Sequence, residues 1–216
     1  MQALEYIQPN MTIGIGTGTT VYWFIQELAK KVKQGMVCQC VPTSHATNTL
    51  ALELGIPMLV LNDIGGIDVT VDGADEIDPQ LNLIKGGGGA LLQEKMVAAA
   101  SAELVIIADS SKYTPQLGAF ALPVEVIPYG WKQVQRHLQN SYAITAALRM
   151  KNEQPFITDH GHYILDAAFQ QIVDPSTLAV ALNTIPGVVE NGLFIHMAAK
   201  AIIAFPDGRV QTYTAG

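Results

Sequence analysis

Short apolar blocks and longer amphipathic segments alternate through the first half of the chain. The short blocks have the length of strands, and in the longer segments apolar residues recur at helical spacing. The pattern predicts strands at 11–16, 37–41, 57–61, 68–73 and 103–109, and helices at 21–34, 46–55 and 89–102. This alternation is typical of a mostly parallel sheet with helices on both faces. Functional residues of such α/β sheets gather at the carboxyl ends of the strands.

The pattern changes near residue 118. The later elements are a strand at 122–128, an amphipathic helix at 131–150, two strands within 156–167, a helix at 176–185, a strand at 187–194, and strands at 200–205 and 209–213 around a Pro-Asp-Gly turn. We therefore expect a Rossmann-like catalytic domain of residues 1–117 and 195–216. A smaller α+β subdomain of ferredoxin-like type is expected at 118–194.

Composition and charge narrow the class of protein. A chain of 216 residues with 49% hydrophobic and 14% charged residues has enough apolar surface to form a folded core, which excludes a disordered protein. The net charge of −7 gives no basic footprint for nucleic acid or an anionic membrane. No apolar run reaches membrane-spanning length and no signal-peptide pattern begins the sequence, so we expect a cytoplasmic protein. Cys38 and Cys40 lie two residues apart on an expected strand, which is poor disulfide geometry, and both are expected to be reduced and buried.

The glycine-rich segment 14–20 (GIGTGTT) joins a predicted strand to a predicted helix. Glycines let backbone amides approach an anion closely, and the helix N-terminus and the hydroxyls of Thr17, Thr19 and Thr20 add donors. A phosphate or carboxylate fits such a site; a tight turn with a threonine cap is the alternative. The glycine spacing, the absence of an acid at the end of the second strand and the absence of a P-loop lysine disfavour a dinucleotide site.

The acidic segment 72–78 (DGADEID) follows an apolar strand. The carboxylate of Asp72 is expected to project from the carboxyl edge of the sheet, with Asp75 one turn onward. The cluster fits a metal site, hydrogen bonding to sugar hydroxyls, or a solvated turn, and the last suits Glu76 and Asp78 better than Asp72. The spacing of an EF-hand is not met, which disfavours calcium.

Lys85 precedes four glycines and a mostly apolar helix. Consecutive glycines are entropically costly, which favours a backbone that passes close to a ligand over a plain loop. Glu94 lies about one turn inside the helix. An apolar setting raises the pKa of a carboxylate and suits a general base, but Glu94 fits equally a helix-dipole partner on the solvent face. Lys95 is expected to be solvated.

Lys112 and the histidines complete the candidates. Lys112 follows another strand end (IADSSK), where it suits either a counter-charge for an anion or a surface position after a helix cap. His160 and His162 are expected to be surface residues of a polar turn, because no third ligand for a metal is visible. We expect no metal site.

In this order, the segments GIGTGTT, DVTVDGADEID, LIKGGGGALLQEK, IADSSK, LPVEVIP, ILD and IPGVVENGLF resemble the landmarks of the A-type ribose-5-phosphate isomerases, over nearly the whole chain. The resemblance implies that Glu94 is the proton acceptor. It implies that the substrate-binding residues are Thr17, Gly18, Thr19, Thr20, Asp72, Gly73, Ala74, Asp75, Lys85, Gly86, Gly87, Gly88 and Lys112. It also implies no cofactor, and a homodimer or a dimer of dimers. One departure is that the family carries a lysine near the phosphate in its N-terminal helix, whereas this chain has no Lys or Arg before Lys30.

The implied reaction interconverts D-ribose 5-phosphate and D-ribulose 5-phosphate in the non-oxidative branch of the pentose phosphate pathway. It requires removal of the C2 proton, a cis-enediolate, and return of the proton at C1. We assign both proton transfers to Glu94, and the stabilisation of the developing charge to Lys85 and the glycine amides. Asp72 and Asp75 are expected to accept hydrogen bonds from sugar hydroxyls, one of them assisting ring opening.

Two other functions are compatible with a sugar-phosphate or nucleotide pocket. A sugar-phosphate-binding regulator would keep the pocket without the chemistry, and the presence of Glu94 and Lys85 disfavours it. A nicotinamide-dependent oxidoreductase would need an acid for the cofactor's ribose, which the chain lacks at the expected place.

Overall fold

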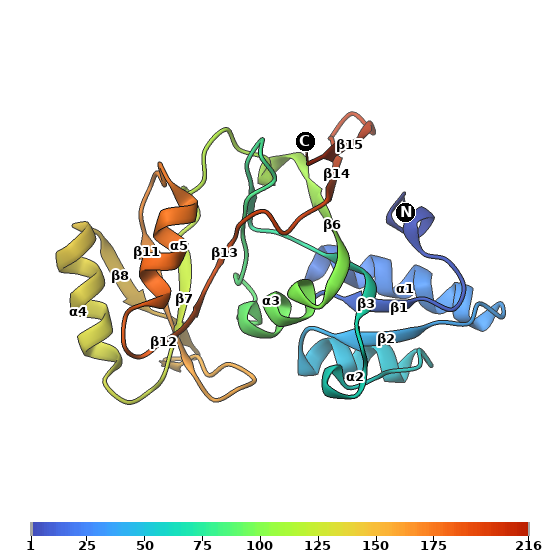
Figure 1. Cartoon of the computed structure of the whole chain (residues 1–216), viewed down its shortest axis with the longest axis horizontal. Helices are drawn as coiled ribbons and strands as arrows, with labels where there is room; N and C mark the ends of the chain where they lie inside the picture. Colours follow the sequence, from blue (N-terminus) through green and yellow to red (C-terminus); the bar gives the residue numbers. More distant parts are fainter. Residues whose placement is uncertain (1, 216) are drawn as a thin grey trace. The chain divides into compact units, whose positions relative to one another are not determined.

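The computed structural model describes residues 2–215, which form two compact units (Figure 1). Unit 1 comprises residues 2–74, 93–112 and 196–215, and unit 2 comprises residues 75–92 and 113–195. Residues 75–92, 113–117 and 195, which the sequence pattern assigns to the larger domain, thus group with unit 2. Unit 1 is therefore built from three separate stretches of chain.

Unit 1 contains a six-stranded sheet in the order β15-β14-β6-β3-β1-β2. Its strands are β1 (Thr12–Ile15), β2 (Gln39–Pro42), β3 (Ile67–Asp72), β6 (Ser101–Asp109), β14 (Lys200–Ala204) and β15 (Val210–Thr214). All neighbours are parallel except β14 and β15. This confirms the predicted mostly parallel sheet.

The helical segments of unit 1 are η1 (Gln2–Tyr6), α1 (Thr19–Lys33), α2 (His45–Glu53), η2 (Leu61–Asp63), η3 (Ser110–Lys112) and most of α3 (Leu91–Ala99). The apolar stripe of α1 recurs at helical spacing, and Val21, Phe24 and Leu28 are buried in one core with residues of β1 and β3. The strand predicted at 57–61 is wrong: Met58 makes only an isolated bridge to Cys40, and the chain then turns into η2.

Unit 2 contains a four-stranded antiparallel sheet in the order β12-β7-β11-β8. Its elements are β7 (Leu122–Val126), α4 (Trp131–Tyr142), β8 (Thr145–Leu148), β11 (Tyr163–Ala168), α5 (Pro175–Asn183) and β12 (Val188–Asn191). This βαββαβ connectivity confirms the ferredoxin-like prediction. Alternate residues of β7, such as Val124, lie in one core with Leu138 of α4 and Leu182 of α5.

Three predicted elements of unit 2 differ from the structure. The helix predicted at 131–150 ends at Tyr142, because Ala143 adopts a left-handed conformation (φ 52°) and residues 145–148 pair with β11. The strand predicted at 187–194 is interrupted at Gly192 and continues as β13 (Leu193–Phe194). Within 156–167 only β11 forms, and it pairs with β8 and β7. A separate hairpin lies earlier, where β9 (Met150–Lys151) pairs with β10 (Gln154–Pro155).

A three-stranded antiparallel sheet, β13-β5-β4, was not predicted. It pairs β4 (Glu76–Ile77) with β5 (Leu83–Ile84), and β5 with β13. The glycine segment after Lys85 therefore begins directly at the end of a paired strand. In the described part of the chain, no helix is long and apolar enough to cross a membrane.

Candidate active site

β1 and the turn that follows it pack closely against β3, because two glycines there have no side chains. A Cβ atom on Gly14 would lie 1.8 Å from Oγ1 of Thr70, and one on Gly16 would lie 2.0 Å from Oδ1 of Asp72. Gly18 serves a different purpose: its surroundings are open, but its φ of 116° favours glycine. The turn thus brings exposed Gly18, Thr19 and Thr20 to the N-terminus of α1.

The hydroxyl of Thr17 anchors this turn through hydrogen bonds to three other hydroxyls. Its Oγ1 lies 2.7 Å from Oγ1 of Thr43, 2.9 Å from Oγ of Ser44 and 3.2 Å from Oγ1 of Thr47. Thr47 in turn donates to the carbonyl of Gly16 at 2.9 Å. These three partners are buried. Thr17, whose hydroxyl the sequence suggests as a donor to an anion, is thus the centre of a hydroxyl cluster that the sequence analysis missed.

Asp72 lies at the end of β3 and is 1% exposed, so the solvated turn, which the sequence disfavoured for this residue, is excluded. Its Oδ1 accepts hydrogen bonds from the amides of Gly73 (2.7 Å) and Thr17 (3.2 Å). A buried carboxylate is stabilised by such donors. Asp72 therefore fixes the backbone of two turns, its own and the one after β1.

Glu94 lies in the first turn of α3 and is 4% exposed. Of the two positions that the sequence left open, the structure excludes the solvent face. The neighbouring Gln93 donates from Nε2 to the carbonyl of Pro42 at 3.0 Å, which ties this part of α3 to the end of β2. Lys95, expected to be solvated, is half-buried.

At the end of β6, Asp109 organises the segment that carries Lys112. It accepts hydrogen bonds from the hydroxyl of Ser111 and, at 2.9 Å, from the Ser111 amide. The Ser111 hydroxyl chiefly, with smaller contributions from backbone amides and the charge of Lys112, holds the pKa of Asp109 below its usual value. Lys112 is half-buried in η3.

In unit 2, Asp75 holds the tetraglycine segment (Gly86–Gly89). Its Oδ2 accepts a 2.7 Å hydrogen bond from the Gly87 amide, and a Cβ atom on Gly87 would lie 2.5 Å from Oδ1. Gly86 and Gly89 have positive φ angles of 105° and 85°. Gly87 and Gly88 are exposed. The segment thus combines conformations and close contacts that other residues would strain.

Lys85 is 3% exposed. Its amide donates to the carbonyl of Gly192 at 2.9 Å, and its Nζ lies 5.4 Å from the ring centroid of Phe194. A buried ammonium is costly unless it is stabilised, and buried ionisable side chains are concentrated at functional sites. This burial agrees with a chemical role for Lys85.

Glu76 and Asp78 are each 6% exposed, so the solvated turn expected for them is wrong. Glu76 accepts hydrogen bonds from the amides of Gly118 (2.7 Å) and Phe120 (2.6 Å). Asp78 accepts them from Gln80 and Asn82. Both carboxylates stabilise loops of unit 2. Among residues 2–215, no three His, Cys, Asp or Glu side chains are grouped as metal ligands.

The remaining candidates are the histidines of the polar turn and the two cysteines. His160 is exposed as expected, but His162 is not a simple surface residue: its Nδ1 lies 2.9 Å from Oε1 of Glu125, which is 1% exposed. Cys38 and Cys40 are free and buried, as predicted.

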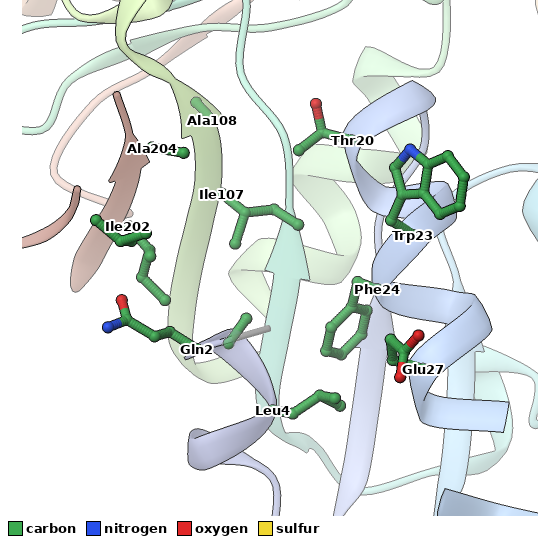
Figure 2. A pocket seen from close by; sticks show the side chains of 12 residues that line it. Gln2, Leu4, Thr20, Trp23, Phe24, Glu27, Ile107, Ala108, Ile202 and Ala204 are labelled. Carbon is green, nitrogen blue, oxygen red and sulfur yellow. The ribbon is translucent and has the colours of Figure 1, made fainter. Parts of the chain in front are cut away.

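A pocket of about 540 Å³ in unit 1 does not suit a sugar phosphate (Figure 2). Its walls are mainly apolar, with Trp23, Phe24 and Ile202 among them, and among residues 2–215 Glu27 is the only charged residue that lines it. Of the expected substrate-binding residues, all of which are described, only Thr20 reaches it. No cationic side chain of residues 2–215 lines it for an anionic ligand.

The family model of ribose 5-phosphate isomerase A (phosphoriboisomerase A) matches residues 39–208. Ribose-5-phosphate isomerase A of Bacillus cereus is 53% identical, over 95% of this chain and 94% of the relative. That of Rhizobium rhizogenes is 50% identical, over 95% and 91%. The solved ribose 5-phosphate isomerase of Plasmodium falciparum has a TM-score of 0.95 and 40% identity, over 99% and 94%. The fold, the ordered motifs and these matches together show that the chain belongs to the ribose 5-phosphate isomerase A family.

Proposed function

We propose that the chain is an aldose–ketose isomerase that interconverts D-ribose 5-phosphate and D-ribulose 5-phosphate through a cis-enediolate. Membership of the family supports the substrate. The observation that carries the chemistry is the burial of Glu94, at 4% exposure, in the first turn of α3. A buried carboxylate of this kind is suited to proton transfer at a substrate carbon as a general base.

Glu94 takes the proton from C2 of the open-chain aldose and returns it to C1 of the enediolate. The negative charge that develops on O1 and O2 needs donors that are already in place. Lys85 supplies one. A solved relative that is 41% identical was captured with phospho-erythronic acid, whose carboxylate matches the charge and planarity of an enediolate. The same anionic intermediate is expected in this chain.

Backbone amides of the tetraglycine segment supply the other donors. The Gly87 amide is used by Asp75, and the Gly89 amide donates to the carbonyl of Gly86 at 2.9 Å. Within residues 2–215, the amides of Gly86 and Gly88 donate to no acceptor. Gly88 is also exposed, which suits a donor to a ligand oxygen.

The phosphate is bound by Gly18, Thr19 and Thr20 at the N-terminus of α1, with Thr17 fixing the turn. Lys112 supplies a counter-charge. Asp72 and Asp75 accept hydrogen bonds from sugar hydroxyls, and the backbone of Gly73 and Ala74 completes that contact. We place the enzyme in the cytoplasm, in the non-oxidative branch of the pentose phosphate pathway, as a homodimer or dimer of dimers; light scattering after size exclusion tests the assembly.

The test is ketose formation from ribose 5-phosphate by the purified protein in excess chelator. Glu94→Gln is expected to reduce kcat by about 10³-fold or more while substrate still binds. Glu53→Gln, an exposed glutamate at the end of α2, is the matched control and is expected to be fully active. Absence of wild-type turnover would refute the activity, and normal kcat in Glu94→Gln would refute the base.

A further inference from the structure

We propose that Arg149 is a positioning residue for the isomerisation, which sets the direction of the Gly88 amide. This inference rests on the proposed function of the tetraglycine segment. Arg149 lies between β8 and β9, 63 and 62 residues from Gly86 and Gly87 in the sequence. No motif marks it, and the sequence pattern places it in a helix that does not form there.

The guanidinium of Arg149 donates hydrogen bonds to three residues. Nη1 donates to the carbonyl oxygens of Gly86 (2.7 Å) and Gly87 (3.1 Å). Nε and Nη2 donate to the two carboxylate oxygens of Asp166, in the bidentate geometry that fixes an arginine most firmly. The side chains of Arg149 and Asp166 are 14% and 27% exposed, which limits the screening of this pair by solvent.

The backbone of Arg149 is fixed as well. Its amide donates to the carbonyl of Ile164 on β11 at 2.8 Å, and its carbonyl accepts from the Phe156 amide at 2.9 Å. The Phe156 ring in turn fills the space beside Gly89, where a Cβ atom would lie 2.3 Å from its Cζ. The guanidinium therefore extends from a rigid sheet towards a segment with four glycines in a row.

The planarity of the peptide bond lets the contact between Arg149 and the glycine carbonyls fix the direction of the N–H groups that follow them. In a trans peptide the C=O and the following N–H lie in one plane and point in opposite directions. The plane that joins Gly86 to Gly87 is held at both ends, by Arg149 at the carbonyl and by Asp75 at the amide. In the next plane Arg149 holds the Gly87 carbonyl, so the Gly88 N–H must point away from the guanidinium. That exposed amide is one of the donors proposed for the enediolate.

Without Arg149, both peptide planes lose an anchor in the most flexible kind of backbone. Donors that stabilise a transition state act through pre-organisation, so misdirection is expected to lower kcat more than it raises KM. Arg149→Met, which keeps the length of the stem, is expected to reduce kcat about 100-fold with KM within about threefold of wild type. Arg149→Lys keeps a positive charge but loses the bidentate pairing with Asp166, and its kcat is expected to fall about tenfold.

The matched control is Arg209→Gln. Arg209 also pairs with an aspartate, Asp207, through Nε at 2.6 Å, but in an exposed turn. Its kcat and KM are expected to equal those of wild type. Asp166→Asn is expected to reduce kcat by a smaller factor than Arg149→Met. It should reduce kcat no further in the Arg149→Met background, because Asp166 acts through Arg149.

Affinity for phospho-erythronic acid separates positioning from a purely structural role. Arg149→Met is expected to weaken its inhibition about as much as it lowers kcat, with KM for ribose 5-phosphate nearly unchanged. Unchanged kcat in Arg149→Met, or unchanged inhibition despite low kcat, would overturn the proposal. If that variant fails to fold, Arg149→Lys and Asp166→Asn decide by the same readouts. A failure of the proposed function is recognised separately, by an inactive wild type or an active Glu94→Gln.

Discussion

Oδ1 of Asp72 accepts a hydrogen bond from the backbone amide of Thr17 at 3.2 Å, which joins the end of β3 to the turn after β1. Three residues later, Asp75 does the same for the Gly87 amide at 2.7 Å within unit 2. Each aspartate of the motif Asp-Gly-Ala-Asp thus orders a glycine-containing turn in its own unit. The motif contributes to backbone geometry as well as to any contact with a ligand.

Asp72→Ala is expected to destabilise the protein by about 1–3 kcal/mol, because the amides of Thr17 and Gly73 lose a buried acceptor. Asp72→Asn keeps an oxygen and should cost less. Urea denaturation measures both. Asp68 on the same strand is the matched control: it accepts from the Thr12 amide at 2.7 Å but is exposed, and Asp68→Ala should cost least. Equal losses for Asp68→Ala and Asp72→Ala would contradict the role of burial.

Gly16→Ala is expected to cost about 1–3 kcal/mol and most of the activity, because its Cβ would displace the Asp72 carboxylate. Gly65→Ala is the control, since Gly65 has open surroundings and no positive φ. Thermal unfolding and kcat/KM of both variants provide the comparison. A Gly16→Ala protein as stable and active as Gly65→Ala would show that the contact is unimportant.

Thr17→Val is expected to change the stability of the protein, whereas Thr20→Val is expected to change substrate binding. Thr17→Val removes the centre of the buried hydroxyl cluster and should lower the Tm, because each lost hydrogen bond costs about 1 kcal/mol of stability. Thr20→Val should leave the Tm unchanged and raise KM for ribose 5-phosphate more than it lowers kcat, because it contacts a group that does not react. An unchanged KM in Thr20→Val would place the phosphate elsewhere.

Ser111→Ala is expected to raise the pKa of Asp109, because the Ser111 hydroxyl is the main cause of its low value. With the folded pKa below the unfolded one, the stabilisation is present above the unfolded value and is lost as the pH falls through the folded value. Carboxyl carbon NMR titration measures the shift, with Ser110→Ala as control. Identical titrations of Asp109 in both variants would contradict the assignment.

Local sequence patterns predicted the features of the fold and the site that neighbouring residues determine. The parallel sheet followed from apolar blocks such as 68–73, and the burial of Lys85 and Glu94 agrees with the roles that their motifs suggested. What failed depends on distant partners. Glu76 can be buried because the amides of Gly118 and Phe120, more than 40 residues away, donate hydrogen bonds to its carboxylate. The same holds for Arg149, whose function depends on carbonyls that no sequence window contains.

Strand order also has a consequence for synthesis. β6 pairs with β3 on one side and with β14 on the other, yet β14 is made only after the whole of unit 2. While the nascent chain leaves the ribosome, residues 105–109 of β6 therefore form an open sheet edge. Until β14 covers it, this edge can aggregate or bind chaperones.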